Sequence, residues 1–196
     1  MRKRWNSPSA NNGPYKTAPP NSSPENVDCP DAPAADEKRI LYPSSPSMNP
    51  GQTFEPNRLR HQRRYNGILY KFSLKPGHSI DVKGFIPEAC IQFAINLGTD
   101  EKNYVLHFNP RFDYSQDKKI IILNSMVDDV FGEEQRESCF PFQEGSDTTV
   151  CFQFEQDKII IELPTGNPLS FPVRFPIEEI SYLSLRNLQL KSITLK

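Results

Sequence analysis

The sequence lacks the features that mark membrane-spanning and secreted chains. Its 196 residues contain no uninterrupted apolar run of about 18–20 residues, the length that a membrane-spanning helix requires. The opening segment, Met1–Pro8, is basic, but no apolar stretch follows it as in a secretory signal peptide. We therefore expect neither a membrane span nor a signal peptide.

Clustered cysteines and an excess of charge are lacking as well. The four cysteines lie far apart and form no CxxC pair, so we expect reduced thiols rather than a zinc site or a disulfide framework. The adjacent Asp128 and Asp129 supply too few oxygen ligands for a calcium loop. The net charge is −1, which gives no reason to expect a nucleic-acid partner. We expect no metal and no cofactor.

Proline and charge divide the chain into two parts. Eleven of the 19 prolines lie in residues 1–66, which carry ten Lys and Arg against six Asp and Glu, or +4. Residues 67–196 carry thirteen against eighteen, or −5. The first part lacks the apolar density for a core, so we predict a disordered, Pro-rich basic arm over 1–66 and one folded domain over 67–196. The basic run 58–64 fits a solvated linker better than a nuclear address or a polyanion contact.

The second part is built of short apolar or alternating segments that are separated by turn residues. No segment carries the stripe of a helix. Many short strands at this spacing are typical of an antiparallel β-sandwich or jelly roll, so the predicted fold class is all-β. The expected strands are 68–74, 79–85, 90–97, 104–108, 119–123, 138–142, 148–155, 158–163, 169–173, 180–186 and 188–195.

Three polar side chains end one of these strands. His107, Asn109 and Arg111 are spaced by two, which places them on one face of the strand, with Phe108 and Phe112 on the other. Imidazole, amide and guanidinium groups in fixed positions supply both donors and acceptors. That combination suits the hydroxyl groups of a sugar.

Further polar residues and one aromatic residue follow along the chain. Asn124 lies at the end of the next strand, and Glu134 and Arg136 share a face, where Glu134 can orient arginine side chains. Phe131 precedes them and can supply the apolar platform that the C–H face of a sugar ring requires.

Together these residues resemble the signature of the galectins, the S-type β-galactoside-binding lectins. The resemblance rests on His107-Phe-Asn-Pro-Arg-Phe112, then Asn124, then Phe131-Gly-Glu-Glu-Gln-Arg136, and it covers essentially all of 67–196. The chain is most similar to the prototype, single-domain galectins. The resemblance implies a two-sheet, concanavalin-like jelly roll whose concave face binds β-galactosides without calcium.

The resemblance also implies a role for each residue. His107, Asn109 and Arg111 would bind the axial 4-hydroxyl of galactose, and Asn124 and Glu134 the 6-hydroxyl. Arg136, held by Glu134, would reach the neighbouring glucose or N-acetylglucosamine. The implied partners are glycans and glycoproteins that carry lactose or N-acetyllactosamine groups.

One position departs from the pattern of the family. Galectins carry Trp where this chain has Phe131, and the only Trp of the chain, Trp5, lies in the arm. If the smaller ring loses about 1 kcal/mol of stacking, affinity falls roughly five- to tenfold. The alternative is a galectin-like structural or protein-interaction module whose sugar binding is lost or altered.

No catalytic arrangement accompanies the polar cluster. A glycosidase needs two carboxylates about 5–9.5 Å apart, one on each side of the scissile bond. The cluster supplies Glu134, which we expect Arg111 and Arg136 to hold. We predict a binding protein and not an enzyme.

The likeness to prototype galectins carries two further expectations. The first is a noncovalent homodimer formed through terminal strands, although the arm before residue 67 could obstruct that edge or fold back across it. The second is a cytoplasmic and nuclear location, with leaderless secretion to the extracellular space.

Overall fold

The computed structural model describes residues 40–41, 48–55 and 67–196. Most of the predicted arm therefore lies outside the described residues. The described part is all-β and contains no helix, so none that could cross a membrane. The prediction of an all-β fold is confirmed.

Fourteen strands make up the described part. They are β1 (Ile40–Leu41), β2 (Thr53–Phe54), β3 (Gly67–Leu74), β4 (Ser79–Ile86), β5 (Ala94–Gly98), β6 (Tyr104–Tyr114), β7 (Asp117–Val127), β8 (Val130–Phe131), β9 (Gln135–Glu137), β10 (Ser146–Phe154), β11 (Lys158–Glu162), β12 (Leu169–Pro172), β13 (Ile180–Arg186) and β14 (Gln189–Leu195).

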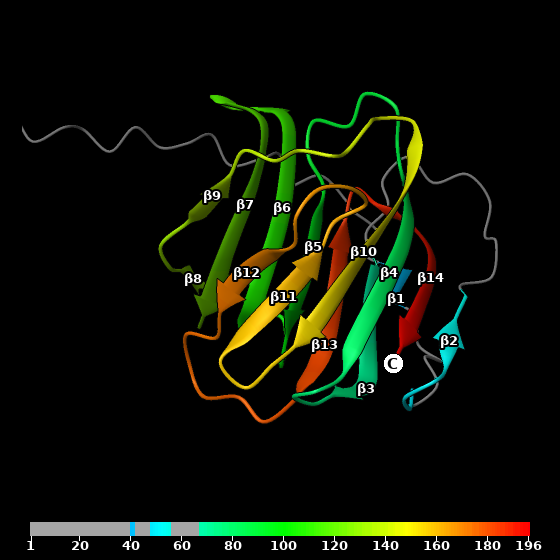
Figure 1. The fold of residues 1–196 in the computed structure, drawn as a ribbon, viewed down its shortest axis with the longest axis vertical. Helices are drawn as coiled ribbons and strands as arrows, with labels where there is room; N and C mark the ends of the chain where they lie inside the picture. Colours follow the sequence, from blue (N-terminus) through cyan, green and yellow to red (C-terminus); the bar gives the residue numbers. More distant parts are fainter. Residues whose placement is uncertain (1–39, 42–47, 56–66) are drawn as a thin grey trace, which may run out of the picture. The chain divides into compact units, whose positions relative to one another are not determined.

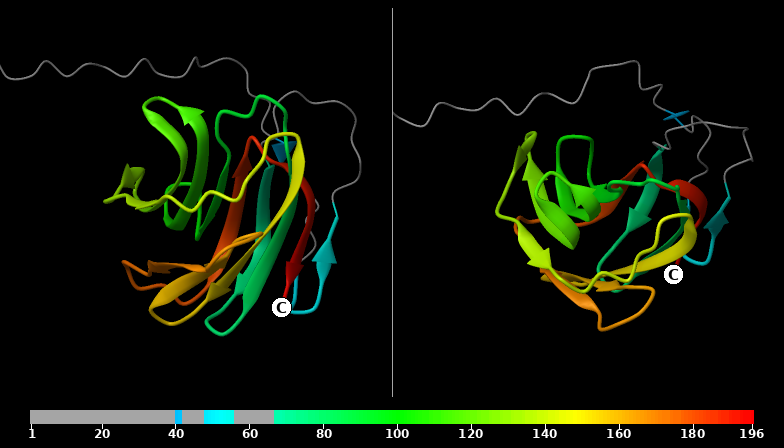
Figure 2. Two further views of the ribbon diagram at one scale, coloured as in Figure 1. Left: turned by 45° about the horizontal axis from the view of Figure 1, so that its top comes forward. Right: turned by 90° about the horizontal axis from the view of Figure 1, so that it is seen from above.

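The strands form two sheets that pack face to face (Figures 1 and 2). The eight-stranded sheet has the order β1-β3-β13-β5-β6-β7-β8, with β9 pairing β7 at the same side as β8. The six-stranded sheet has the order β12-β11-β10-β4-β14-β2. Every pairing is antiparallel except that of β1 with β3. The predicted two-sheet antiparallel sandwich is confirmed.

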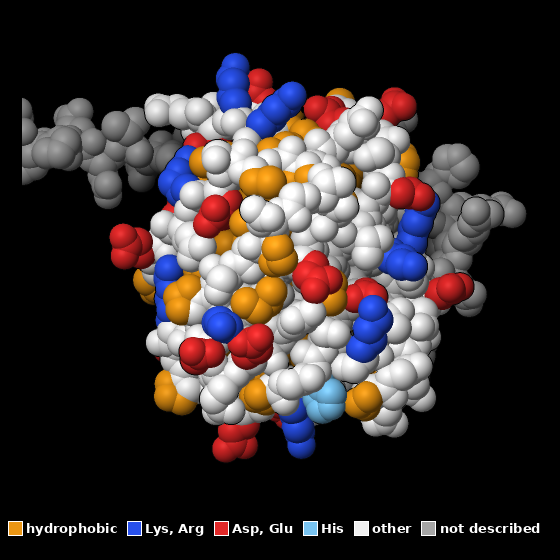
Figure 3. All heavy atoms as spheres, in the orientation of Figure 1, with side chains coloured by type: hydrophobic (Ala, Val, Ile, Leu, Met, Phe, Trp, Pro, Cys, Tyr) orange, Lys and Arg blue, Asp and Glu red, His pale blue; other side chains and the backbone are white. Residues whose placement is uncertain are grey.

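The core fills the space between the sheets with alternate side chains of each strand. On β6, Phe108 is fully buried and Phe112 nearly so, and both face the interior. Phe152 of β10 meets Phe108 from the opposite sheet, with ring centroids 5.6 Å apart at 82°. Burial of these aromatic rings contributes to the stability of the sandwich, and it fixes which face of β6 points outward. The exposed face of the six-stranded sheet carries scattered charges of both signs (Figure 3).

The strand expected at 138–142 is absent from the structure. Pro141 cannot donate to a ladder, and this segment runs without strand pairing between β9 and β10. Its aromatic residues pack inward instead: Phe142 meets Phe93 edge to face at 5.2 Å, and Phe140 meets Phe112 at 5.0 Å. The alternation of Phe140 and Phe142 that suggested a strand reflects packing on the core.

The placement of residues 48–55 in a disordered arm is wrong. Met48 is 3% exposed and belongs to the core cluster, and Phe54 packs against that cluster. The intervening residues make a turn and join β14 as strand β2. The Pro- and Ser-rich composition of the arm conceals these two apolar anchors, which stabilise an ordered segment.

Candidate functional site

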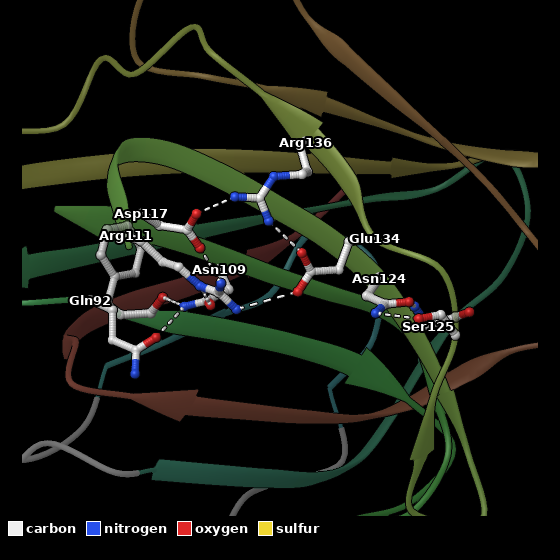
Figure 4. Close-up of polar contacts among 10 residues, drawn as sticks. Gln92, Asn109, Arg111, Asp117, Asn124, Ser125, Glu134 and Arg136 are labelled. Atoms are coloured by element: carbon white, nitrogen blue, oxygen red, sulfur yellow. Dashed lines mark hydrogen bonds and ion pairs between the residues drawn. The ribbon is translucent and has the colours of Figure 1, made fainter. Parts of the chain in front are cut away.

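The predicted site residues gather on the outer face of the eight-stranded sheet. Strand β6 supplies His107, Asn109 and Arg111, and the register places His107 beside Asn124 of β7. Arg136 of β9 lies beside Ile122 of β7, on the same face. The core-facing aromatics of β6 hold this face outward, and Figure 4 shows most of the polar groups together.

A network of four charges occupies one end of the site. Arg111 Nη1 donates to Asp117 Oδ2 over 2.5 Å, and Arg136 Nη2 donates to the other oxygen of that carboxylate. Arg136 Nη1 also donates to Glu134 over 2.5 Å, and Arg111 Nη2 lies 3.6 Å from Glu134. Hydrogen bonding from Arg111, and then from Arg136, lowers the pKa of Asp117. The two carboxylates hold both guanidinium groups in fixed planes.

Asn109 orients the side chain of Arg111 through a hydrogen bond. Its amide nitrogen donates to the backbone oxygen of Phe93 over 2.8 Å and to Gln92 Oε1 over 3.1 Å. Its oxygen accepts from Arg111 Nε over 2.8 Å. The side chain is 3% exposed, so these bonds fix its direction.

His107 is held by a row of polar groups across three strands. Its Nδ1 lies 2.6 Å from Asn96 Oδ1 on β5, and Asn96 in turn donates to Ser184 on β13 over 2.9 Å. Burial, with the charges of Arg111 and Arg186, lowers the pKa of His107 to about 4. The imidazole is therefore neutral at physiological pH. Because Nδ1 donates to an amide oxygen, Nε2 carries the lone pair that can accept from a ligand hydroxyl.

Asn124 is fixed by the loop that carries Phe131. Its amide nitrogen donates to Gly132 O over 2.9 Å, and its oxygen accepts from Ser125 N and from Arg174 Nη1 over 3.2 Å. Arg174 Nη1 also donates to Glu133 O over 2.7 Å. Asn124 is 3% exposed, and one amide hydrogen remains for a ligand.

Phe131 is the exposed aromatic residue of the site. Its side chain is 49% exposed, although a large apolar ring is usually covered. The ring centroid lies 5.0 Å from that of His107, with the planes at 59°. An apolar surface thus stands beside the polar row, as a sugar with one C–H face and one hydroxyl edge requires.

The structure brings all seven predicted residues together on one surface. It adds five that sequence reasoning missed, because each acts through a contact made by folding: Gln92, Asn96, Asp117, Arg174 and Ser184. Asp117 follows Arg111 by six residues around a hairpin. It lies outside the motif residues, between Phe112 and Asn124.

The groups that this surface presents are hydrogen-bond donors and acceptors, with one exposed aromatic ring. In the described part of the chain, no three His, Cys, Asp or Glu side chains are grouped so that they could hold a metal ion. Both carboxylates of the site are engaged by arginines. What the surface offers is an acceptor at His107, donors at Arg111, Arg136 and Asn124, and a bare ring at Phe131.

Comparison with known proteins places the folded part in one family model. The model described as "Galactoside-binding lectin" matches residues 64–195, which include every residue of the site.

Individual relatives agree with that match. Galectin-1 of Rhinella arenarum is 50% identical over 122 residues, which are 62% of this chain and 91% of the relative. A solved toad ovary galectin in complex with N-acetylgalactose has 49% identity and a TM-score of 0.65, covering 66% of this chain and 96% of that one. CG-16, described as a homodimeric agglutinin from chicken liver, has 32% identity and a TM-score of 0.65, covering 67% and 100%.

Proposed function

This chain belongs to the galactoside-binding lectin family, and we propose that it is a calcium-independent lectin that recognises β-galactosides of the lactose and N-acetyllactosamine type on glycoconjugates. The observation that carries the proposal is the arrangement of Arg111. Asn109 and Asp117 direct its guanidinium toward the surface that neutral His107 and exposed Phe131 border.

An axial 4-hydroxyl fits this arrangement chemically. The hydroxyl donates its hydrogen to His107 Nε2, and its oxygen accepts from Arg111. The equatorial hydroxyl of a glucose epimer points elsewhere, so it would leave these polar groups desolvated and unpaired. Each such loss costs about 1–3 kcal/mol, which is enough to select galactose.

The remaining residues extend the contact. The free amide hydrogen of Asn124, with Glu134, suits the 6-hydroxyl, and Arg136 suits the sugar linked to galactose. Phe131 would cover the C–H face of the ring. Because Phe offers less area than Trp, we propose an affinity that is roughly five- to tenfold lower than that of a Trp-bearing site.

We propose further that the protein acts by binding alone and catalyses no reaction, because Glu134 and Asp117 are committed to arginines rather than poised around a bond. A cytoplasmic and nuclear location, with leaderless secretion to the exterior, is proposed on family likeness. A noncovalent homodimer is proposed for the form in which the edge of β14 is free.

The experiment that tests the function compares lactose with cellobiose, which differs from lactose only at the 4-hydroxyl of its nonreducing sugar. Titration calorimetry of the full chain should give binding to lactose and N-acetyllactosamine, unchanged by EDTA, and at least tenfold weaker binding to cellobiose. Arg111→Met should abolish lactose binding. Absence of binding to lactose and N-acetyllactosamine at millimolar concentration would contradict the proposal.

A further inference from the structure

Residues 48–55, here called the edge segment, lie along the outer side of β14. Thr53 and Phe54 pair with Thr194 and Ile193 in antiparallel register. The segment and β14 are close neighbours in two views (Figures 1 and 2). An element from the amino-terminal part of the chain therefore ends the six-stranded sheet.

Several contacts fix the edge segment in place. Gln52 N donates to Asn49 O over 3.1 Å and closes a turn, in which Gly51 has φ +88°, a conformation that favours glycine. Gly51 N donates to Leu195 O over 2.8 Å, and Leu195 N donates to Gln52 O over 3.1 Å. At the start of the segment, Met48 is buried in the core cluster.

The sandwich has two long edge strands, and described residues from before Gly67 lie against both. Strand β3 has eight residues, and it pairs with β1 and, through the isolated bridge of Phe72, with Met48. Strand β14 has seven residues and pairs with β2. The strands at the opposite sides are short: β12 has four residues and ends in Pro172, β8 has two and β9 has three. Short or proline-bearing edges resist pairing with another chain, whereas long ones invite it.

We propose that the edge segment occupies the edge of β14 along which the homodimer of the proposed function would pair, and that it thereby keeps the full-length protein monomeric. Strands in a sheet are about 4.8 Å apart, so the partner's strand would lie where β2 now lies. Two copies of β14 related by a two-fold axis pair antiparallel and continue the sheet, which is the self-complementary arrangement of a closed dimer.

A second copy is the occupant that fits best. The backbone groups of Ile193–Leu195 need partners of the same kind as those that β2 supplies, and an identical strand supplies them. The structurally similar CG-16 is described as homodimeric, which shows that a sandwich of this kind can associate with itself.

The edge segment and a second copy of the chain would compete for the edge of β14 at unequal concentrations. The edge segment is tethered to the domain, so its effective concentration is on the order of millimolar. A second copy competes at its own concentration, about micromolar in a usual preparation. When the edge segment is bound to β14, the protein is a monomer with one sugar site. When the edge segment is displaced, two chains can form a dimer with two sugar sites.

The test measures the mass of the full-length protein by sedimentation equilibrium in reducing buffer. The protein concentration runs from about 1 to about 100 µM, which is below the effective concentration of the tethered segment. We expect the native chain to be monomeric. Met48→Asp places a charge in the core position of the anchor, and Gly51→Val strains the turn, so both should release the segment and give a dimer. Met48→Leu is the matched control, and it should stay monomeric.

A disulfide lock tests the opposite state. Thr53 and Thr194 are Cα partners with hydroxyl oxygens 3.0 Å apart, so T53C/T194C can join the segment to β14. The lock is introduced into Gly51→Val. Oxidised, this protein should return to a monomer, and dithiothreitol should restore the dimer, with nonreducing electrophoresis confirming an intramolecular bond.

Two results would overturn the proposal. One is a Gly51→Val chain that becomes protease-sensitive at residues 48–55 yet stays monomeric at about 100 µM, the highest protein concentration of the series. The other is a native or locked chain that is dimeric while the segment is seated. Thermal unfolding of each variant shows that the domain is intact, and none of these readouts depends on sugar binding.

Discussion

Arg111 Nη1 and Asp117 Oδ2 lie 2.5 Å apart, in an ion pair that joins two neighbouring strands at the end of the sugar-facing surface. The same carboxylate accepts from Arg136. One acidic residue therefore fixes both arginines that we assign to the ligand.

Removing the charge of Asp117 should disorder both guanidinium groups. Hydrogen bonds to charged partners contribute about 1.5–3 kcal/mol each, so Asp117→Asn should weaken lactose binding at least tenfold in titration calorimetry. Asp113→Asn is the matched control, because Asp113 pairs only loosely with Lys118 at 3.7 Å and its side chain is 66% exposed. Equal affinities for the two variants would contradict the orienting role of Asp117.

Enlarging the ring at position 131 should strengthen binding. Phe131→Trp adds stacking area and should lower the dissociation constant of lactose roughly five- to tenfold, whereas Phe131→Ala should raise it by a similar factor. The midpoint of thermal unfolding should move little in either case, since the ring is half exposed. A tighter Ala variant would show that the ring does not face the sugar.

Lactose binding should be insensitive to pH between about 5.5 and 8. The pKa of His107 is lowered to about 4 by burial, Arg111 and Arg186, so Nε2 stays an acceptor throughout this range. Affinity should fall as the pH approaches 4, where the ring gains a proton. Calorimetric titrations at several pH values test this, and an inflection near 6.5 would refute it.

The same pKa sets a pH dependence of stability. The folded-state pKa lies below the unfolded value of about 6.5, so the unfolded chain takes up the proton first as pH falls. The contribution of neutral His107 to the free energy of unfolding is full above about pH 6.5 and is lost between about 6.5 and about 4. Urea unfolding should therefore give a flatter profile for His107→Gln over this interval.

Arg174 should matter for binding although it was absent from the predicted site. Its Nη1 donates to both Asn124 and Glu133 O, and its guanidinium lies 4.6 Å from the Phe171 ring. Arg174→Gln should release the loop that carries Phe131 and weaken lactose binding severalfold. Lys158→Gln, on the other sheet, is the control and should leave the affinity unchanged.

A close backbone approach should make one glycine intolerant of substitution. A Cβ on Gly98 would lie 2.0 Å from the carbonyl oxygen of Asn103, which is backbone and cannot move aside easily. Gly98→Ala should lower the free energy of unfolding by at least about 2 kcal/mol, measured in urea. A loss below 0.5 kcal/mol (about the effect of an ordinary surface substitution) would show that the strand edge adjusts.

The sequence allowed prediction of features that depend on local spacing. His107, Asn109 and Arg111 share a face because a strand repeats every two residues, and the structure has them so. The all-β class followed from many short segments with turn residues between them. These patterns are properties of neighbouring positions, which a single sequence displays.

Features that depend on distant contacts could not be predicted in this way. Arg174 reaches Asn124 across 50 positions, and nothing near Arg174 in the sequence marks that contact. The burial of Met48 was not predicted, because the residues around it have the composition of a disordered segment. The core that stabilises its position is supplied by other strands. The alternation of Phe140 and Phe142 was misleading because packing aromatics and strand residues can share a period of two.

The end of the chain has a practical consequence. Lys196 N and O both bond to Ser79, and Lys196 Nζ lies 2.6 Å from Asp81, so the carboxyl terminus is part of the six-stranded sheet. The sugar-facing surface belongs to the other sheet. A biosensor that immobilises the protein through a carboxy-terminal linker would thus leave the ligand-facing side open to glycans in solution.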